Sequence, residues 1–220
     1  MSKKKDIPEK AAIVQRDRET YAIAPHLPGG LVTPDVLRNI ADVAERYDAK
    51  AMKISSAERI VIVGLEEDKL DDAWKDLGMP PGAAIGLCVR SVKFCPGTTF
   101  CKVGLQDAVG MGLKLDEKYH GMALPSKFKI GVSGCPNTCA ESPIKEIGLV
   151  GRKEGWEMWV GGRLGRKPRL GQVLTNGLSD DEALALIEKI IEYYKANAGK
   201  QRLGDYIDEI GWDAFKEAVL

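Results

Sequence analysis

Histidine is scarce in this chain of 220 residues, which has only His26 and His120. A haem with axial histidines, or a metal site built from several histidines, is therefore poorly supplied. No apolar run reaches the ~20 residues that a transmembrane helix needs. The 32 basic and 32 acidic side chains leave no net charge, which argues against a nucleic-acid-binding protein held by bulk electrostatics. The length gives room for one or two domains with a real core.

Other signals are missing as well. The chain begins Met-Ser-Lys-Lys-Lys without the apolar stretch of a secretory signal, so a cytoplasmic location is expected. There are no repeats and no low-complexity tract. No Gly-x-Gly-x-x-Gly nucleotide fingerprint is present. Any electrons that the chain uses are therefore expected to come from another protein, such as a small ferredoxin or a cytochrome.

Cysteine carries the strongest signal. Cys95 and Cys101 are separated by five residues, and Cys135 and Cys139 by three. Four thiolates gathered from two loops can hold an iron–sulfur cluster. Each pair opens with Cys-Pro beside a glycine, a kind of turn that leaves backbone N–H groups free to point at cluster sulfurs. The fifth cysteine, Cys88, lies in an apolar run and is interpreted as a small buried side chain.

Two simpler interpretations of the cysteines remain open. Disulfides are rare in cytosolic proteins, and pairing four cysteines would leave Cys88 over. Structural zinc usually has two to four residues between paired cysteines, so the five-residue spacing from Cys95 to Cys101 is loose for a zinc site.

The cysteine block resembles the siroheme-dependent sulfite and nitrite reductases. That family has Cys-x5-Cys, then Cys-x3-Cys, with a Leu-Pro-x-Lys-x-Lys strand before the second pair, here residues 124–129. Weaker pieces are Leu-Pro-Gly-Gly at 27–30 and Ile-Gly-Leu-Val-Gly at 147–151. The resemblance covers about residues 20–165. It implies a 4Fe–4S cluster on the four cysteines and a siroheme whose iron shares the thiolate of Cys139.

The resemblance also implies an activity. We expect six-electron reduction of sulfite to sulfide, or of nitrite to ammonium by the same machinery. An iron–sulfur electron-transfer subunit without catalysis is the alternative from another class. Family enzymes contain two such halves, so a second copy of the chain or another subunit is a further expected partner.

Two lysines form the candidate anion site. Lys127 and Lys129 are two apart on a predicted strand, so both point to the same face. Two like charges on a buried face would be costly without an anion. The alternative is a solvent-facing edge strand that carries protective lysines.

Two arginines are further candidates. Arg90 lies in an apolar strand and needs a partner, which the resemblance identifies as substrate or siroheme and which is otherwise a local carboxylate. The family's arginine in the first domain is replaced here by Ala57, and Arg59, two residues on, would emerge on the same face. Near the N-terminus, Ala24 and His26 stand where relatives carry arginines. The resemblance adds three cofactor contacts: Thr98, Thr99 and Asn137.

The pattern of elements predicts an α+β protein of two domains. A strand–helix–strand–strand–helix order suggests a ferredoxin-like unit over residues 1–80, with the Pro-Pro-Gly that begins at residue 80 as the boundary. Residues 81–220 are expected to form the siroheme and 4Fe–4S domain. Its predicted elements are a strand at 85–94, a helix at 102–118, strands at 127–133, 146–151 and 156–161, and helices at 180–197 and 211–220.

Overall fold

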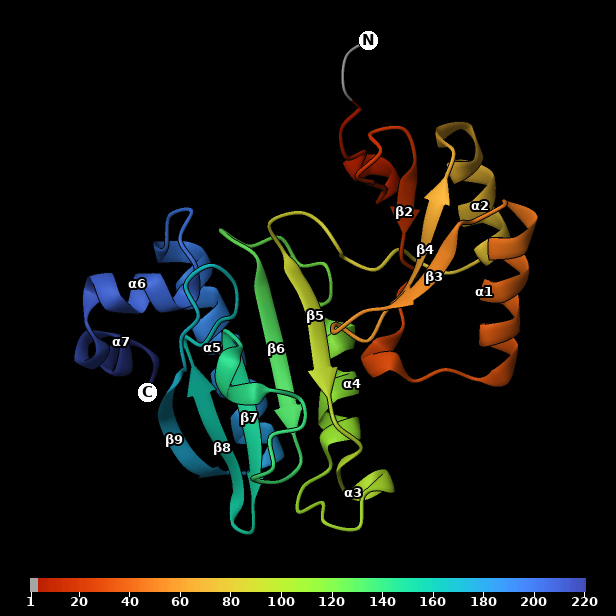
Figure 1. Ribbon diagram of the computed structural model, residues 1–220. Helices are drawn as coiled ribbons and strands as arrows, with labels where there is room; N and C mark the ends of the chain where they lie inside the picture. The colour runs from red at the N-terminus through yellow and green to blue at the C-terminus, as the bar shows by residue number, and fades with distance from the viewer. Residues whose placement is uncertain (1–3) are drawn as a thin grey trace. The chain divides into compact units, whose positions relative to one another are not determined.

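The computed structural model describes residues 4–220 and divides into two compact units, Met1–Gly86 and Leu87–Leu220. Figure 1 shows each unit as a sheet with helices packed on it. Each unit has its own hydrophobic core. No described helix is both long and apolar enough to cross a bilayer.

The first unit is a four-stranded antiparallel sheet with the order β1-β2-β4-β3. Two helices, α1 and α2, pack against each other and contribute to its core. The bounds are β1 Ile13–Val14, β2 Tyr21–Ile23, α1 Pro34–Arg46, β3 Ala51–Ile54, β4 Ile60–Leu65 and α2 Leu70–Leu77.

Helix α1 begins where the sequence predicts. The Thr33 side chain accepts a hydrogen bond from the Val36 N–H at 3.3 Å, and a proline follows the cap. Ile40 and Val43 on its inner face are buried. Leu37, three residues before Ile40, is 44% exposed, so the buried stripe of this helix is narrow.

The second unit is a five-stranded mixed sheet with the order β5-β6-β7-β8-β9. The first three strands are parallel, and the last two are antiparallel to their neighbours. Helix α4 contacts β5 and β6, and α5 contacts β8 and β9. The bounds are β5 Val89–Phe94, α3 Gly97–Phe100, α4 Ala108–Tyr119, β6 Phe128–Ser133, η4 Ser142–Ile144, β7 Ile147–Arg152, β8 Gly155–Val160, β9 Gln172–Leu178, α5 Asp180–Asn197, α6 Leu203–Ile210 and α7 Trp212–Val219.

The predicted α+β class is confirmed, with several differences in the second unit, where the strand predicted from residue 85 begins at Val89. Helix α4 begins at Ala108 instead of residue 102, because the Asp107 side chain accepts the Gly110 N–H at 3.0 Å and caps the helix there. Strand β9 and helices α3 and α6 were not predicted at all. All three lie between elements that the sequence did predict, so the order of the remaining elements is unchanged.

Candidate metal centre

The first cysteine of each pair follows a parallel strand. Cys95 comes directly after β5, and Cys135 follows β6 by two residues. These strands are neighbours, and the Cys95 N–H donates to the Val132 carbonyl at 3.0 Å. The Gly134 N–H donates to the Cys95 Sγ at 3.1 Å. The loops that carry the two pairs therefore meet at the carboxyl ends of β5 and β6.

The second cysteine of each pair lies on a tight turn. The Cys101 N–H donates to the Gly97 carbonyl at 2.9 Å, and the Thr138 N–H donates to the Cys135 carbonyl at 3.2 Å. Cys135 is buried, Cys101 is half-buried and Cys139 is exposed. All five cysteines are free thiols, and Cys88 is buried as its apolar run predicts.

Glycines allow the two cysteine loops to touch. A Cβ on Gly134 would lie 2.7 Å from the Gln106 carbonyl oxygen and 2.8 Å from the Gly97 Cα. A Cβ on Gly104 would lie 2.5 Å from the Gly97 carbonyl carbon, and one on Gly151 would lie 2.5 Å from the Gly134 oxygen. Real side chains essentially never approach backbone this closely, so these positions require glycine.

The loop after Cys135 turns back over the sheet. Thr138 and Glu141 both have left-handed backbone, with φ of 49° and 58°, a conformation that costs energy in a β-branched residue such as threonine. The Ser133 and Ser142 hydroxyls share a hydrogen bond of 2.8 Å, and the Ala140 N–H donates to Ser133. Ala140, the residue after Cys139, thereby packs on the face of β6 opposite the hydrophobic core.

Paired charges flank this loop. The Glu141 carboxylate lies 2.9 Å from the Lys145 Nζ and 3.6 Å from the Lys93 Nζ. The hydrogen bond from Lys145 lowers the pKa of Glu141, and its burial opposes this only in part. Both lysine side chains are largely buried, so the carboxylate compensates two charges beside the cysteines.

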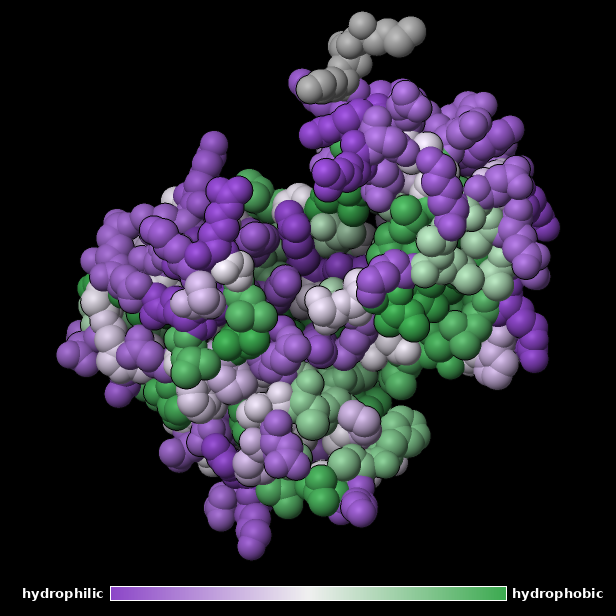
Figure 2. Space-filling view, viewed as in Figure 1, coloured by the Kyte–Doolittle hydropathy of each residue, from purple (hydrophilic) through white to green (hydrophobic). Residues whose placement is uncertain are grey.

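Hydrophobic side chains reach the surface beside the other cysteine loop. Phe100 and Val103, on either side of Cys101, are 69% and 48% exposed. Figure 2 shows this hydrophobic surface around α3 at the lower edge of the second unit.

The candidate lysines lie at the other end of β6. Phe128 and Ile130 enter the core, so Lys129 points to the opposite face, where it is half-buried. Lys127 is half-buried just before the strand begins. Lys129 is the second residue of β6, whereas Cys135 lies in the loop that follows the strand. Both lysines therefore lie at the amino end of β6, and the loop with Cys135 lies beyond its carboxyl end.

The two candidate arginines belong to different units. Arg90 is half-buried on β5, at a point where the pairing with β6 shifts register. Arg59 lies in the turn between β3 and β4 of the first unit, half-buried, with its Nη2 3.5 Å from the Ala83 carbonyl oxygen. His26 is half-buried in the same unit, and its backbone N–H donates to the Pro80 carbonyl at 2.8 Å.

The three remaining candidates lie on the cysteine loops. The Thr98 N–H donates to the Gln106 carbonyl at 3.1 Å, and the Thr99 hydroxyl donates to Asp107 at 3.0 Å. Asn137 is exposed between Cys135 and Cys139. Their positions are compatible with contact to a group held by the thiols.

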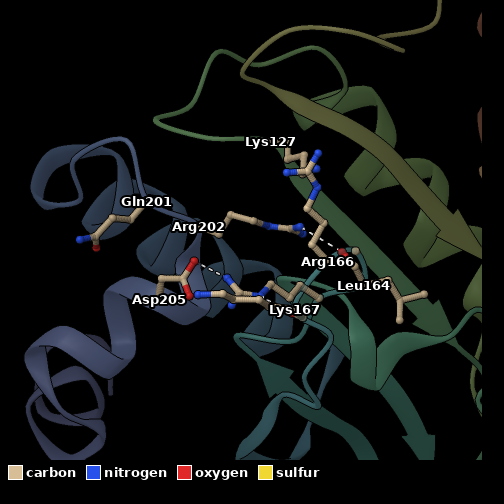
Figure 3. A pocket seen from close by; sticks show the side chains of 9 residues that line it. Lys127, Leu164, Arg166, Lys167, Gln201, Arg202 and Asp205 are labelled. Atoms are coloured by element: carbon tan, nitrogen blue, oxygen red, sulfur yellow. Dashed lines mark hydrogen bonds and ion pairs between the residues drawn. The ribbon is translucent and has the colours of Figure 1, made fainter.

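Sequence reasoning missed a pocket of about 550 Å³ in the second unit. It is lined by Lys127 and by residues from the loop after β8 and the start of α6 (Figure 3). The lining residues are Lys127, Arg163, Leu164, Gly165, Arg166, Lys167, Gln201, Arg202 and Asp205. The density of basic residues and glycines in residues 161–171 was the available signal.

A buried carboxylate forms an ion pair with one of the arginines that line this pocket. The Glu146 side chain is almost fully buried and accepts the Arg202 Nε–H at 2.6 Å and the Lys129 backbone N–H at 2.9 Å. Burial raises the pKa of Glu146, and the Arg202 guanidinium opposes that effect. Glu146 thus links β6, through Lys129, to Arg202 just before α6.

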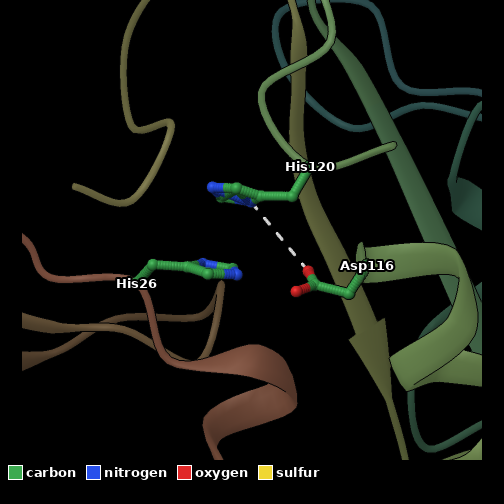
Figure 4. Close-up of side chains that lie close together, drawn as sticks. All are labelled: His26, Asp116 and His120. Atoms are coloured by element: carbon green, nitrogen blue, oxygen red, sulfur yellow. Dashed lines mark ion pairs between the residues drawn. The ribbon is translucent and has the colours of Figure 1, made fainter. Parts of the chain in front are cut away.

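His120 ends α4 beside an acid. Its Nδ1 lies 3.9 Å from the Asp116 Oδ1, one helical turn earlier (Figure 4). Both side chains are largely buried, at 13% exposed for His120 and 5% for Asp116.

Comparison with known proteins identifies the family. The nitrite and sulphite reductase 4Fe-4S domain matches residues 85–220, and the nitrite/sulfite reductase ferredoxin-like half domain matches residues 13–79. The chain is 45% identical to an assimilatory-type sulfite reductase of Nitratidesulfovibrio vulgaris, over 96% of this chain and 97% of that protein. It is 37% identical to a nitrite reductase (NAD(P)H) of Bacillus subtilis, over 91% of this chain but 25% of that protein.

Two solved structures share the fold. The crystal structure of dissimilatory sulfite reductase I superposes with a TM-score of 0.81 at 17% identity, over 90% of this chain and 68% of that chain. The Mycobacterium tuberculosis NirA protein gives 0.79 at 20% identity, over 90% of this chain and 39% of that chain. With matches to both domains and a relative aligned over nearly its whole length, the chain belongs to the nitrite and sulphite reductase 4Fe-4S family.

Proposed function

We propose that this chain is a siroheme and 4Fe–4S oxidoreductase that reduces sulfite to sulfide with six electrons. The observation that carries the proposal is the meeting of two cysteine pairs at one sheet edge, on loops that pack against each other. The similarity to an assimilatory-type sulfite reductase over nearly the whole chain supports sulfite as the substrate.

The thiols fit a 4Fe–4S cluster. Such a cluster takes four thiolates, and the sequence supplies four on two loops, at Cys95, Cys101, Cys135 and Cys139. The Gly134 N–H already points at the Cys95 sulfur, as hydrogen bonds that tune a cluster's potential do. We infer that these four residues are the ligands and that the exposed Cys139 thiolate is shared with the siroheme iron.

Siroheme, when bound, supplies the iron at which the anion is reduced, and the cluster supplies electrons one at a time. The chain's own residues would bind and protonate the anion. A guanidinium keeps its protons at neutral pH, so Arg90 and Arg59 are assigned to binding. An ammonium group can donate a proton, so Lys127 and Lys129 are assigned to protonation of oxygen as it leaves sulfur.

Nitrite is the second candidate substrate. Several relatives named as nitrite reductases align over more than nine-tenths of this chain, with identities of 31–37%. Nitrite and sulfite are both compact anions rimmed by oxygen, so a cationic site discriminates weakly between them. For either substrate we propose an external one-electron donor protein of the ferredoxin or cytochrome type.

An optical spectrum of anaerobically purified protein, made with siroheme supplied, tests the proposal. Siroheme adds a Soret band and a red band to the broad absorption of a cluster. A cluster spectrum alone would overturn the enzyme assignment in favour of an electron-transfer subunit. Steady-state rates with reduced viologen would then rank sulfite against nitrite.

Cys139→Ser tests the shared thiolate. We expect loss of turnover and a changed siroheme spectrum, because the bridge between the two centres is removed. Cys88→Ala is the matched control, since Cys88 is a buried thiol outside both pairs. Full turnover in Cys139→Ser would refute the bridging role.

A further inference from the structure

The pocket beside Lys127 contains cations without counter-charges. In the part of the chain that the structure describes, Lys127, Arg166 and Lys167 form no ion pair, and Arg166 and Lys167 are exposed. Figure 3 shows the three side chains around the pocket, on a loop and on the segment before β6. Cations gathered without acids favour an anionic ligand, because like charges repel when nothing compensates them.

Two further arginines that line the pocket are held in place by ion pairs. Arg163 pairs with Asp205 through its Nη1, and its Nε donates to the Lys167 carbonyl at 2.8 Å. Arg202 pairs with the buried Glu146 and also donates to the Leu164 carbonyl at 3.3 Å. These contacts fix both guanidinium groups before any ligand arrives, which reduces the entropy that binding must overcome.

The charge and the volume define the ligand class. Five cations stand against the carboxylates of Asp205 and Glu146, which leaves three positive charges uncompensated. The volume of about 550 Å³ lies in the range of pockets for organic molecules and far exceeds the size of sulfite or nitrite. A ligand that matches both properties is an organic molecule with several anionic groups.

We propose that this pocket binds an organic polyanion through its carboxylate groups, with Arg166 and Lys167 as the residues that respond to the ligand. Two sources share this chemistry. One is the carboxylate-bearing rim of siroheme, an assignment that rests on the proposed function. The other is a free polycarboxylate, since the pocket lies at the amino end of β6 whereas the cysteine loop follows its carboxyl end.

The double variant Arg166→Gln/Lys167→Gln tests the pocket in the full-length holoprotein. Both residues are exposed on a loop, so the fold is expected to survive. Lys189→Gln/Lys195→Gln removes the same charge from exposed positions on α5 and is the matched control. Two quantities are measured: the ratio of siroheme to cluster absorption, and the affinity for citrate by calorimetry.

A several-fold lower siroheme content in the double variant, with cluster iron retained and the control normal, identifies siroheme as the ligand. Unchanged siroheme with citrate binding to the wild type, weakened roughly tenfold or more in the double variant, identifies a free polycarboxylate. If neither quantity changes relative to the control, the pocket proposal is overturned. Wild-type protein without siroheme would contradict the proposed function alone, because the citrate measurement still decides the pocket.

Lys127→Gln provides a second variant on a different segment. If the pocket is a single site, this change lowers the same quantity that the loop variant lowers. An effect of the loop variant that Lys127→Gln does not share would place the ligand outside the pocket and contradict the assignment.

Discussion

Gly134→Ala is the sharpest test of how the cysteine loops are held together. The added Cβ would lie 2.7 Å from the Gln106 carbonyl oxygen and 2.8 Å from the Gly97 Cα. Both are backbone atoms, so neither can rotate away as a flexible side chain would. The segments that carry Cys95 and Cys135 must therefore separate by several tenths of an ångström.

The magnitude follows from two opposing effects. Overpacking of this kind costs about 1–3 kcal/mol. Gly134 does not have left-handed backbone, so alanine adds no conformational strain and instead restricts the unfolded chain by about 0.4–1 kcal/mol. The net loss in the free energy of unfolding is about 1–2 kcal/mol, which lowers the melting temperature by roughly 3–10 °C.

Thermal unfolding of the metal-free protein measures this loss, and iron–sulfur reconstitution measures its effect on the thiols. Gly199→Ala is the control, because nothing lies within 4 Å of a Cβ at that position and its backbone is not left-handed. We expect the control to melt at or slightly above the wild-type temperature. If Gly134→Ala melts with the control and takes up iron equally well, the close contact between the two loops is not as described.

Three other substitutions have defined outcomes in urea unfolding. Glu141→Gln leaves the buried Lys145 ammonium without its carboxylate and should cost about 1–2 kcal/mol, reduced because the Glu141 side chain is 41% exposed. The contribution of this pair is complete above pH 4.5, the carboxyl's ordinary pKa, and disappears as the pH falls through the lowered value; equal acid sensitivity in the variant would contradict it. Ser179→Ala removes the cap of α5 and should cost about 1 kcal/mol, whereas no change would mean that the cap contributes nothing. Trp156→Phe removes the indole bond to Asp180 at 2.7 Å and leaves a buried gap, for a loss of about 1–3 kcal/mol, and a stability equal to wild type would be inconsistent with that burial.

The sequence predicted the elements whose ends are marked by residues close in the chain, such as helix caps. Ser179 is a favourable N-cap for the helix predicted at 180–197, and the structure has a capping box there with Glu182. Thr33 and Pro34 predicted the start of α1 in the same way. The cysteine spacing predicted two loops that could share one inorganic group, and the loops do meet.

The missed elements lack such signals. The sequence of β9, Gln-Val-Leu-Thr-Asn-Gly-Leu, does not alternate apolar and polar residues. It is an edge strand, and only Leu174 in it is buried. Helix α6 is only eight residues long and contains Gly204 in its first turn. The cationic pocket combines Lys127 with two other segments, and only the order of the strands brings them together.

The glycine contacts at the cysteine loops have a consequence for assembly. They bring backbone against backbone, as does the hydrogen bond from the Cys95 N–H to the Val132 carbonyl. A zinc finger needs its ion to fold, but this sheet edge is stabilised by the same hydrophobic core as the rest of its unit. Chelator treatment should therefore remove the cluster absorption without unfolding the protein. The cluster would then be inserted into a domain that has already folded.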